Sequence, residues 1–244
     1  MVNLLTTKNI FKIHLLFYIT GLICFLTGFF KQFIIFTSII LIHELGHITG
    51  ALMFKWKIDK IILLPFGGIT IFNEKIDKPL YQEFIIAILG PMFQIIFYFI
   101  FKDNYVFSLY NKIILAFNLI PIVPLDGSKI VNILFNRFIS FKRSHLCTIY
   151  ISFIILILLF IYNKFSLMTI LILIFILKEI ILEYKKHRYY VKKFILEKYL
   201  YKCIYKRKKV IKNIDDMKKQ TNHIIKYENK YYFEREILDK MFDK

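Results

Sequence analysis

The stretch Ile42-His43-Glu44-Leu45-Gly46-His47-Ile48 decides the interpretation of this chain, because it places an H-E-x-x-H pattern inside an apolar run. Four residues apart on a helix, His43 and His47 lie on one face and Glu44 lies on the neighbouring face. Two imidazole nitrogens at this spacing can hold one Zn²⁺ ion, with the glutamate beside them as an acid/base. Glu44 is the only charged residue between positions 33 and 54. The pattern therefore predicts a zinc site inside a membrane span.

A helix face that carries polar residues by accident is the alternative. Placing a carboxylate in hydrocarbon without a function costs a few kcal/mol, and two histidines add to that cost. A metal site is therefore the preferred interpretation.

The composition indicates an α-helical polytopic membrane protein. Hydrophobic residues make up 57% of the 244 residues and the mean hydropathy is +0.55, more apolar surface than a soluble domain of this length needs. The three cysteines are scattered, without a C-x-x-C pattern, which argues against a disulfide framework and a thiolate zinc site. The apolar stretches predict about six transmembrane helices, at 10–30, 33–54, 84–101, 106–135, 148–162 and 165–182.

The formal net charge of +18 fits the same class. Lysine and arginine gather after the second and fourth predicted spans and beyond the sixth, so the positive-inside rule places both termini in the cytoplasm. The segment 183–244 holds 19 Lys and Arg against 9 Asp and Glu, and we expect its first half to lie along the anionic leaflet of the lipid bilayer. Nucleic-acid binding is the alternative, but no fold motif accompanies the charge and no nucleic-acid partner is expected.

Two domains are expected from this pattern. Residues 1–182 form the six-span intramembrane part, and residues 183–244 form a basic cytoplasmic tail. The sequence predicts helix over 184–212, followed by a small α/β piece with a helix at 214–220, a strand at 223–227, a turn at 228–230 and a helix at 235–242.

The segment 61–71 is apolar yet contains Pro65 and the pair Gly67-Gly68. It is too short to span a membrane as a helix, and a membrane-edge β hairpin fits its composition. The edge of such a hairpin could pair with an extended substrate backbone, which makes Gly67 and Gly68 candidate substrate-positioning residues. A simple apolar connector remains the other interpretation.

A hydrolytic zinc site needs a third protein ligand. Asp126 is the only acid in the fourth predicted span and follows a break at Pro121 and Pro124. A carboxylate that caps the freed backbone N–H groups is the alternative. Asn118 could hold an unwound substrate backbone or a developing oxyanion, or could form a hydrogen bond between packed helices. In the zinc interpretation Glu44 takes a proton from the attacking water and delivers it to the leaving amine.

These motifs together resemble the site-2 proteases, a family of intramembrane zinc metalloproteases. The resemblance rests on His43-Glu44-Leu45-Gly46-His47, Pro65-Phe66-Gly67-Gly68, Gly90-Pro91 and Asn118…Pro121…Pro124-Leu125-Asp126-Gly127. It implies His43, His47 and Asp126 as zinc ligands and Glu44 as the catalytic acid/base. The length and layout are most similar to the stage IV sporulation branch of that family.

Resemblance to that branch implies a substrate and a cellular location. The substrate would be a sigma-factor precursor, pro-sigma-K, cleaved at the membrane surrounding the forespore, and inhibitory membrane proteins would be partners. Two positions depart from the common pattern: Gln94 stands where many members carry Asn, and Ser128 where a second Gly is common. We expect both to affect substrate positioning and to leave the zinc ligands intact. The tail resembles at most a reduced CBS-like piece.

Other functions have weaker support. A membrane zinc protease of the prenyl-endopeptidase type would need a distal glutamate motif, which is not evident. A metal-ion transporter would need more acids and histidines along several spans. A non-catalytic scaffold or chaperone that keeps the protease fold has no need of Glu44, so it remains the alternative to the protease.

Overall fold

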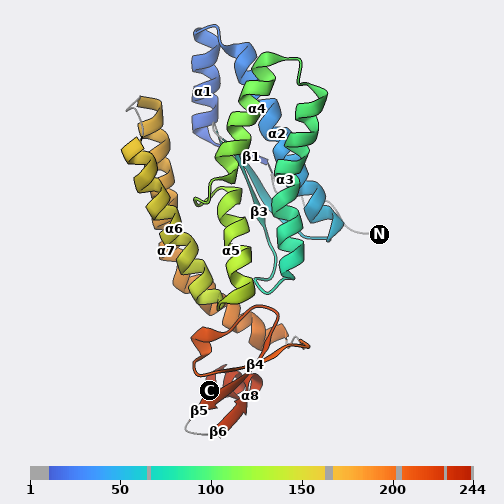
Figure 1. Cartoon of the computed structure of the whole chain (residues 1–244), viewed down its shortest axis with the longest axis vertical. Helices are drawn as coiled ribbons and strands as arrows, with labels where there is room; N and C mark the ends of the chain where they lie inside the picture. The colour runs from blue at the N-terminus through green and yellow to red at the C-terminus, as the bar shows by residue number, and fades with distance from the viewer. Residues whose placement is uncertain (1–10, 65–66, 163–166, 202–204, 228–229, 243–244) are drawn as a thin grey trace. The chain divides into compact units, whose positions relative to one another are not determined.

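The computed structural model describes residues 11–64, 67–162, 167–201, 205–227 and 230–242. The chain divides into two compact units, and each is described by itself. The first comprises Met1–Glu74 and Ile85–Leu119, and the second comprises Lys75–Phe84 and Ile120–Lys244. Figure 1 shows the elements in chain order by colour. The expected division between residues 182 and 183 stays a prediction.

The helices of the first unit are arranged around α2. This helix (Phe30–Met53) contacts α1 (Leu15–Leu26) and α4 (Tyr105–Leu119), and α3 (Leu80–Ile100) joins the unit from Ile85 onward. Gly46 faces α3 so closely that a Cβ atom there would collide with the backbone of Leu89 and Gly90. Small residues allow such close approach of helices in membranes. The H-E-x-x-H segment is thus held directly against α3.

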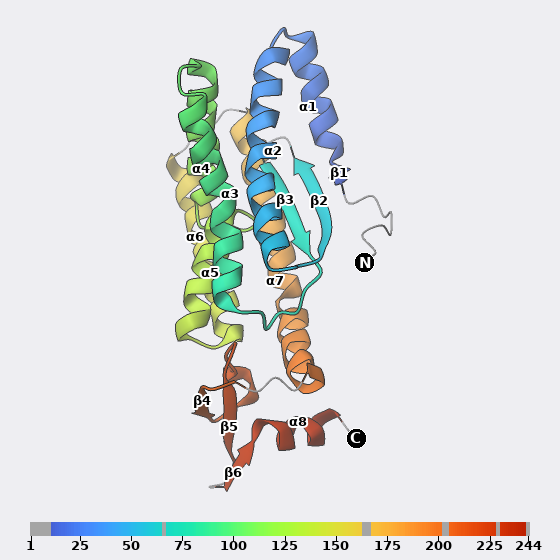
Figure 2. The ribbon, with the colours of Figure 1, turned by 90° about the vertical axis from the view of Figure 1, so that its right-hand side faces the viewer.

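A three-stranded sheet completes the first unit. β2 (Ile58–Leu64) and β3 (Gly67–Phe72) pair antiparallel, with Leu63 opposite Gly68, and β1 (Phe11–Ile13) pairs parallel to β2. The expected hairpin is confirmed in its two strands, and Pro65 and Phe66 lie outside the described residues. β3 contacts α2, and Figure 2 shows the hairpin lying along that helix.

The first predicted span differs from its expected bounds. Residues Phe11–Ile13 belong to the sheet, and α1 covers only Leu15–Leu26. The His14 ring accepts a hydrogen bond from the Leu16 backbone N–H, which starts the helix at this point. These residues pair with β2, which lies fifty residues further along the chain. Because of this pairing they form a strand, although hydropathy alone assigned them to a membrane span.

The second unit begins with the connection before α3 and the first turn of that helix, and continues after Leu119. The expected break in the fourth span is present: α4 ends at Leu119 and α5 covers Asp126–Phe138. Pro121 and Pro124 between them have no backbone N–H to offer a helix. α6 (Phe141–Tyr162) and α7 (Leu167–Tyr201) follow and lie side by side.

The C-terminal part of the second unit is a small α/β piece. β5 (Asn222–Tyr227) pairs parallel with β4 (Lys208–Ile211) and antiparallel with β6 (Lys230–Phe233), and α8 (Glu234–Phe242) follows. Phe194 of α7 shares a buried core with Ile211, Met217, Ile225 and Leu238 of this piece.

Two local expectations for the tail are wrong. The expected helix at 214–220 is only a 3-10 turn, η1 (Ile214–Asp216), because the Lys218 N–H donates to the His223 ring and Gln220 has a φ of 52°. The helix expected over 184–212 ends at Tyr201, and Lys208–Ile211 is a strand. Of the expected turn at 228–230, residues 228 and 229 lie outside the described residues.

The chain is mostly helical and rich in apolar helices. Among the described residues, three helices are long and apolar enough to cross a membrane: α2, α3 and α6. α1 is apolar but shorter. The count of six spans stays a prediction.

Candidate metal and active site

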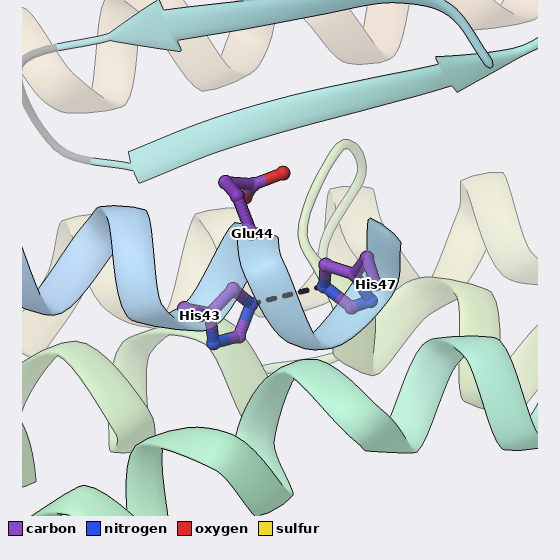
Figure 3. A group of neighbouring side chains, drawn as sticks. All are labelled: His43, Glu44 and His47. Carbon is purple, nitrogen blue, oxygen red and sulfur yellow. Dashed lines mark hydrogen bonds between the residues drawn. The ribbon is translucent and has the colours of Figure 1, made fainter. Parts of the chain in front are cut away.

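His43, Glu44 and His47 lie together near the middle of α2. Their exposed fractions are 2%, 2% and 3%, and one ligand atom from each lies within 4.8 Å of the others. Among the described residues this is the one group of three such side chains close enough to hold a metal ion. Figure 3 shows the two imidazoles on one side of the helix and the Glu44 carboxyl directed toward the hairpin strands.

Both imidazoles have an acceptor at Nδ1. His43 Nδ1 lies 3.0 Å from Gln94 Oε1, and His47 Nδ1 lies 2.8 Å from the carbonyl oxygen of Ile86. Gln94 is oriented in turn, because its Nε2 donates to the Asn111 carbonyl over 2.9 Å. Since a carbonyl oxygen can only accept, Nδ1 of each ring carries the proton. Each Nε2 therefore presents a lone pair.

The two Nε2 atoms face each other at 3.1 Å, as the dashed line in Figure 3 shows. Two lone pairs at this distance repel unless a cation or a proton lies between them. Gly90 leaves space on this side, because a Cβ atom there would collide with both imidazole rings. Two buried imidazoles with converging Nε2 lone pairs and with Nδ1 bound to acceptors are the arrangement that zinc ligands adopt, so the residues present fit the metal.

The carboxyl of Glu44 lies against β3. Its Oε2 accepts a hydrogen bond of 2.5 Å from the hydroxyl of Thr70. Gly68 makes this possible, since a Cβ atom at that position would come within 2.5 Å of the Glu44 carboxyl. β3 is one of the two edge strands of its sheet among the described residues. The candidate acid/base is therefore fixed beside a strand edge.

The other predicted site residues fall in both units. Asn118 is 7% exposed in the last turn of α4, and a Cβ atom on Gly67 would lie 3.9 Å from its Oδ1. Asp126 is the first residue of α5, is 5% exposed, and its carboxylate pairs with Lys129 Nζ at 2.8 Å. Asp126 belongs to the second unit, so its role as third ligand stays a prediction.

Sequence reasoning missed three parts of this site: Thr70, the Ile86 carbonyl and the role of Gln94. Gln94 was expected to affect substrate positioning, but its amide is bonded to the ring of His43. Its place in the chain, 51 residues after His43, gives no local signal for that contact. Thr70 could have been suspected from its alternation with Gly68 on one face of a predicted strand.

Comparisons with known proteins agree with this geometry. Residues 31–108 match peptidase family M50. Over 207 residues the chain is 33% identical to the stage IV sporulation protein FB of Bacillus subtilis (strain 168), covering 78% of this chain and 72% of that protein. It is 34% identical over 125 residues to the zinc metalloprotease MJ0392 of Methanocaldococcus jannaschii, which covers 46% of this chain and 36% of that protein.

A solved structure is similar as well. The site-2 protease from Methanocaldococcus jannaschii superposes with a TM-score of 0.57 and 26% sequence identity, over 71% of this chain and 89% of that one. The similarity covers the fold as well as the motif.

Proposed function

Because the chain belongs to peptidase family M50, the site-2 proteases, we propose that it is an intramembrane zinc metalloendopeptidase that cleaves a sigma-factor precursor at a membrane during sporulation. The arrangement of His43, Glu44 and His47 is the observation that carries the proposal. Relatives of this chain are named zinc metalloproteases, and the two Nε2 atoms offer that metal two ligands. Asp126 is the proposed third ligand.

Glu44 performs the proton transfers. Zinc, when bound, acts as a Lewis acid that makes a water molecule more acidic and polarises a carbonyl group. Glu44 accepts the proton of the attacking water and passes it to the amine that leaves. The hydrogen bond from Thr70 fixes one carboxyl oxygen of Glu44, and the other oxygen accepts and donates the proton. A carboxyl held in one position loses little entropy on reaching the transition state.

The hairpin offers a place for the substrate. A peptide in helical form shields its own backbone, so the substrate must be extended before attack. The edge of β3 can pair with such an extended segment, and Gly68 and Thr70 on this strand contact the acid/base. Asn118, buried beside Gly67, would bind the unwound backbone or the oxyanion.

The substrate class and location rest on similarity to the sporulation relative. With 33% identity over 72% of that protein, a sigma-factor precursor of the sigma-K type is the proposed substrate. We place the chain in the membrane surrounding the forespore, with both termini in the cytoplasm and inhibitory membrane proteins as partners. The first half of the basic tail, residues 184–212, would lie along the anionic leaflet.

The test is cleavage of a pro-sigma-K-type precursor co-expressed with the chain in a heterologous membrane. Wild type is expected to cleave it, and Glu44→Gln at equal protein level is expected not to. Glu236→Gln, the same substitution at an exposed position of α8, is the matched control and should cleave as wild type does.

A scaffold or chaperone is the alternative function. It would bind the precursor equally well in wild type and in the Glu44→Gln variant, and would leave it intact in both cases. Equal cleavage by wild type and Glu44→Gln would instead refute the role of Glu44.

A further inference from the structure

An open groove of about 580 Å³ lies on the second unit, among residues that the proposed protease chemistry does not use. One wall is the first turn of α3 and the other is the C-terminal half of α5. The walls are apolar and partly exposed: Tyr81 and Leu134 are 60% and 47% exposed, and Phe84 and Ile133 lie beside them. Space of this size accommodates a small molecule or part of a larger amphiphile.

Three cations surround the groove. Arg137 stands in the last turn of α5, and Lys206 and Arg207 come from the segment after α7. All three side chains are exposed, and within the described part of the chain none of them takes part in an ion pair. The residues that line the groove include no acid. The groove thus combines apolar walls with an uncompensated positive edge.

The segment that carries two of these cations is held in place. The Asn222 side chain bonds both the N–H and the carbonyl of Tyr205, and the Asn222 N–H donates to the Arg207 carbonyl over 2.9 Å. The Tyr205 hydroxyl donates to Asp77 over 2.9 Å, which ties the segment to the connection before α3. The positive edge is therefore formed before any ligand arrives.

We propose that this groove binds one acidic phospholipid, with its phosphate at Arg137, Lys206 and Arg207 and the start of its acyl chains along Tyr81, Phe84 and Leu134. α3 is a candidate membrane span, and the groove lies at its first turn, where a span meets the lipid headgroups. Basic pockets at the cytoplasmic ends of membrane helices attract acidic headgroups, and the predicted orientation puts this end in the cytoplasm. A soluble anion would leave the apolar walls uncovered, so charge and hydrophobicity together favour a lipid.

The experiment uses the full chain, purified in detergent and examined by native mass spectrometry with phosphatidylglycerol or phosphatidylcholine added. Wild type is expected to retain one phosphatidylglycerol per chain in preference to phosphatidylcholine. Arg137→Gln combined with Arg207→Gln should weaken that retention about tenfold or more, since each surface cation contributes to anionic-lipid attraction. Leu134→Gln, which removes an exposed apolar wall, should weaken retention of phosphatidylglycerol without changing the charge.

Lys185→Gln combined with Arg188→Gln is the matched control, because it removes two exposed cations from α7 outside the groove. It should retain the lipid as wild type does. Equal loss in the control, or equal retention of the two lipids by wild type, would overturn the proposal. Displacement of the lipid by glycerol phosphate at a similar concentration would show a plain phosphate site and overturn it as well.

Discussion

At the scale of single residues, Gln94 extends the site beyond the H-E-x-x-H pattern. Its Oε1 accepts from His43 Nδ1, and its Nε2 is fixed by the Asn111 carbonyl. Partners of this kind hold a metal ligand in one tautomer, and their loss typically lowers metal affinity 10- to 100-fold. Gln94→Leu keeps the side-chain size and removes the acceptor, so zinc affinity should fall about 10- to 100-fold, measured by competition with a chelator in the Glu44→Gln background.

The controls for Gln94 separate the hydrogen bond from packing. Gln94→Glu keeps an acceptor at the same distance along the side chain and should retain zinc. Gln82→Leu is the same substitution in the first turn of the same helix and should bind zinc as wild type does. Unchanged affinity in a folded Gln94→Leu protein would contradict the role of Gln94.

The adjacent glycines of the hairpin allow a paired test. A Cβ atom on Gly68 would come within 2.5 Å of the Glu44 carboxyl, whereas one on Gly67 would lie 3.9 Å from Asn118 Oδ1, an ordinary contact distance. Because the Glu44 carboxyl is the end of a flexible side chain, Gly68→Ala should displace it and leave the fold intact. We expect Gly68→Ala to lower kcat about 10²- to 10³-fold, in the range of a lost general base, with zinc still bound. Gly67→Ala should lower kcat less than Gly68→Ala does, and equal loss in both variants would contradict this explanation.

At the scale of elements, the contact between α2 and α3 depends on Gly46. A Cβ atom there would collide with the Leu89 carbonyl and the Gly90 Cα, which are backbone atoms that cannot turn aside. Gly46→Ala should therefore force the helices apart and destabilise the first unit by about 1–3 kcal/mol, as overpacked cores do. The measurement is the thermal unfolding midpoint in detergent.

Gly21→Ala gives the comparison for Gly46. Its Cβ would lie 3.1 Å from ring carbons of Phe33, and a ring can rotate, so a smaller decrease in the unfolding midpoint is expected. If Gly21→Ala destabilised the protein as much as Gly46→Ala, backbone approach would not explain the effect.

The elements that the sequence predicted correctly are those with a local signal. The H-E-x-x-H spacing places His43 and His47 together through helical geometry alone, and the proline pair ends α4 through its own chemistry. β1 and the hydrogen bond between His43 and Gln94 each join chain segments about fifty residues apart. The periodicity of the sequence carries no information about contacts of this range. For the same reason the sequence named the two histidines of the candidate metal site but not the acceptors that fix their tautomers.

At the scale of the whole molecule, a buried charge network unites parts of the second unit that are distant in sequence. The Lys198 side chain is 3% exposed, and its Nζ donates to the Thr221 carbonyl and lies 3.8 Å from Asp77 and 3.3 Å from Glu234. Asp77 belongs to the connection before α3, and Glu234 is the first residue of α8. Since a buried cation without its carboxylate partners is costly, the network depends on the charge of Glu234.

Glu234 makes this network sensitive to pH. Burial alone would raise the pKa of Glu234, but hydrogen bonds from the ring and backbone of His223, together with the charge of Lys198, lower it below the ordinary value of 4.5. A carboxyl whose pKa is lowered by folding contributes stability above its unfolded pKa and loses it as pH falls through the folded value. The C-terminal piece should therefore be stable from neutral pH down to about pH 4.5 and open progressively below it.

Hydrogen exchange of β5 and α8, corrected for the intrinsic pH dependence, measures this opening. Glu234→Gln keeps an acceptor for His223 but carries no charge, so it should lower the stability of the piece by about 2 kcal/mol at neutral pH and flatten the pH dependence below 4.5. Glu236→Gln, exposed on the same helix, should keep the wild-type profile. Because Lys198 lies beside both Asp77 and Glu234, lowering the pH should also raise hydrogen exchange in the connection before α3. If the hydrogen exchange of that connection did not change with pH, the network would not couple the two segments.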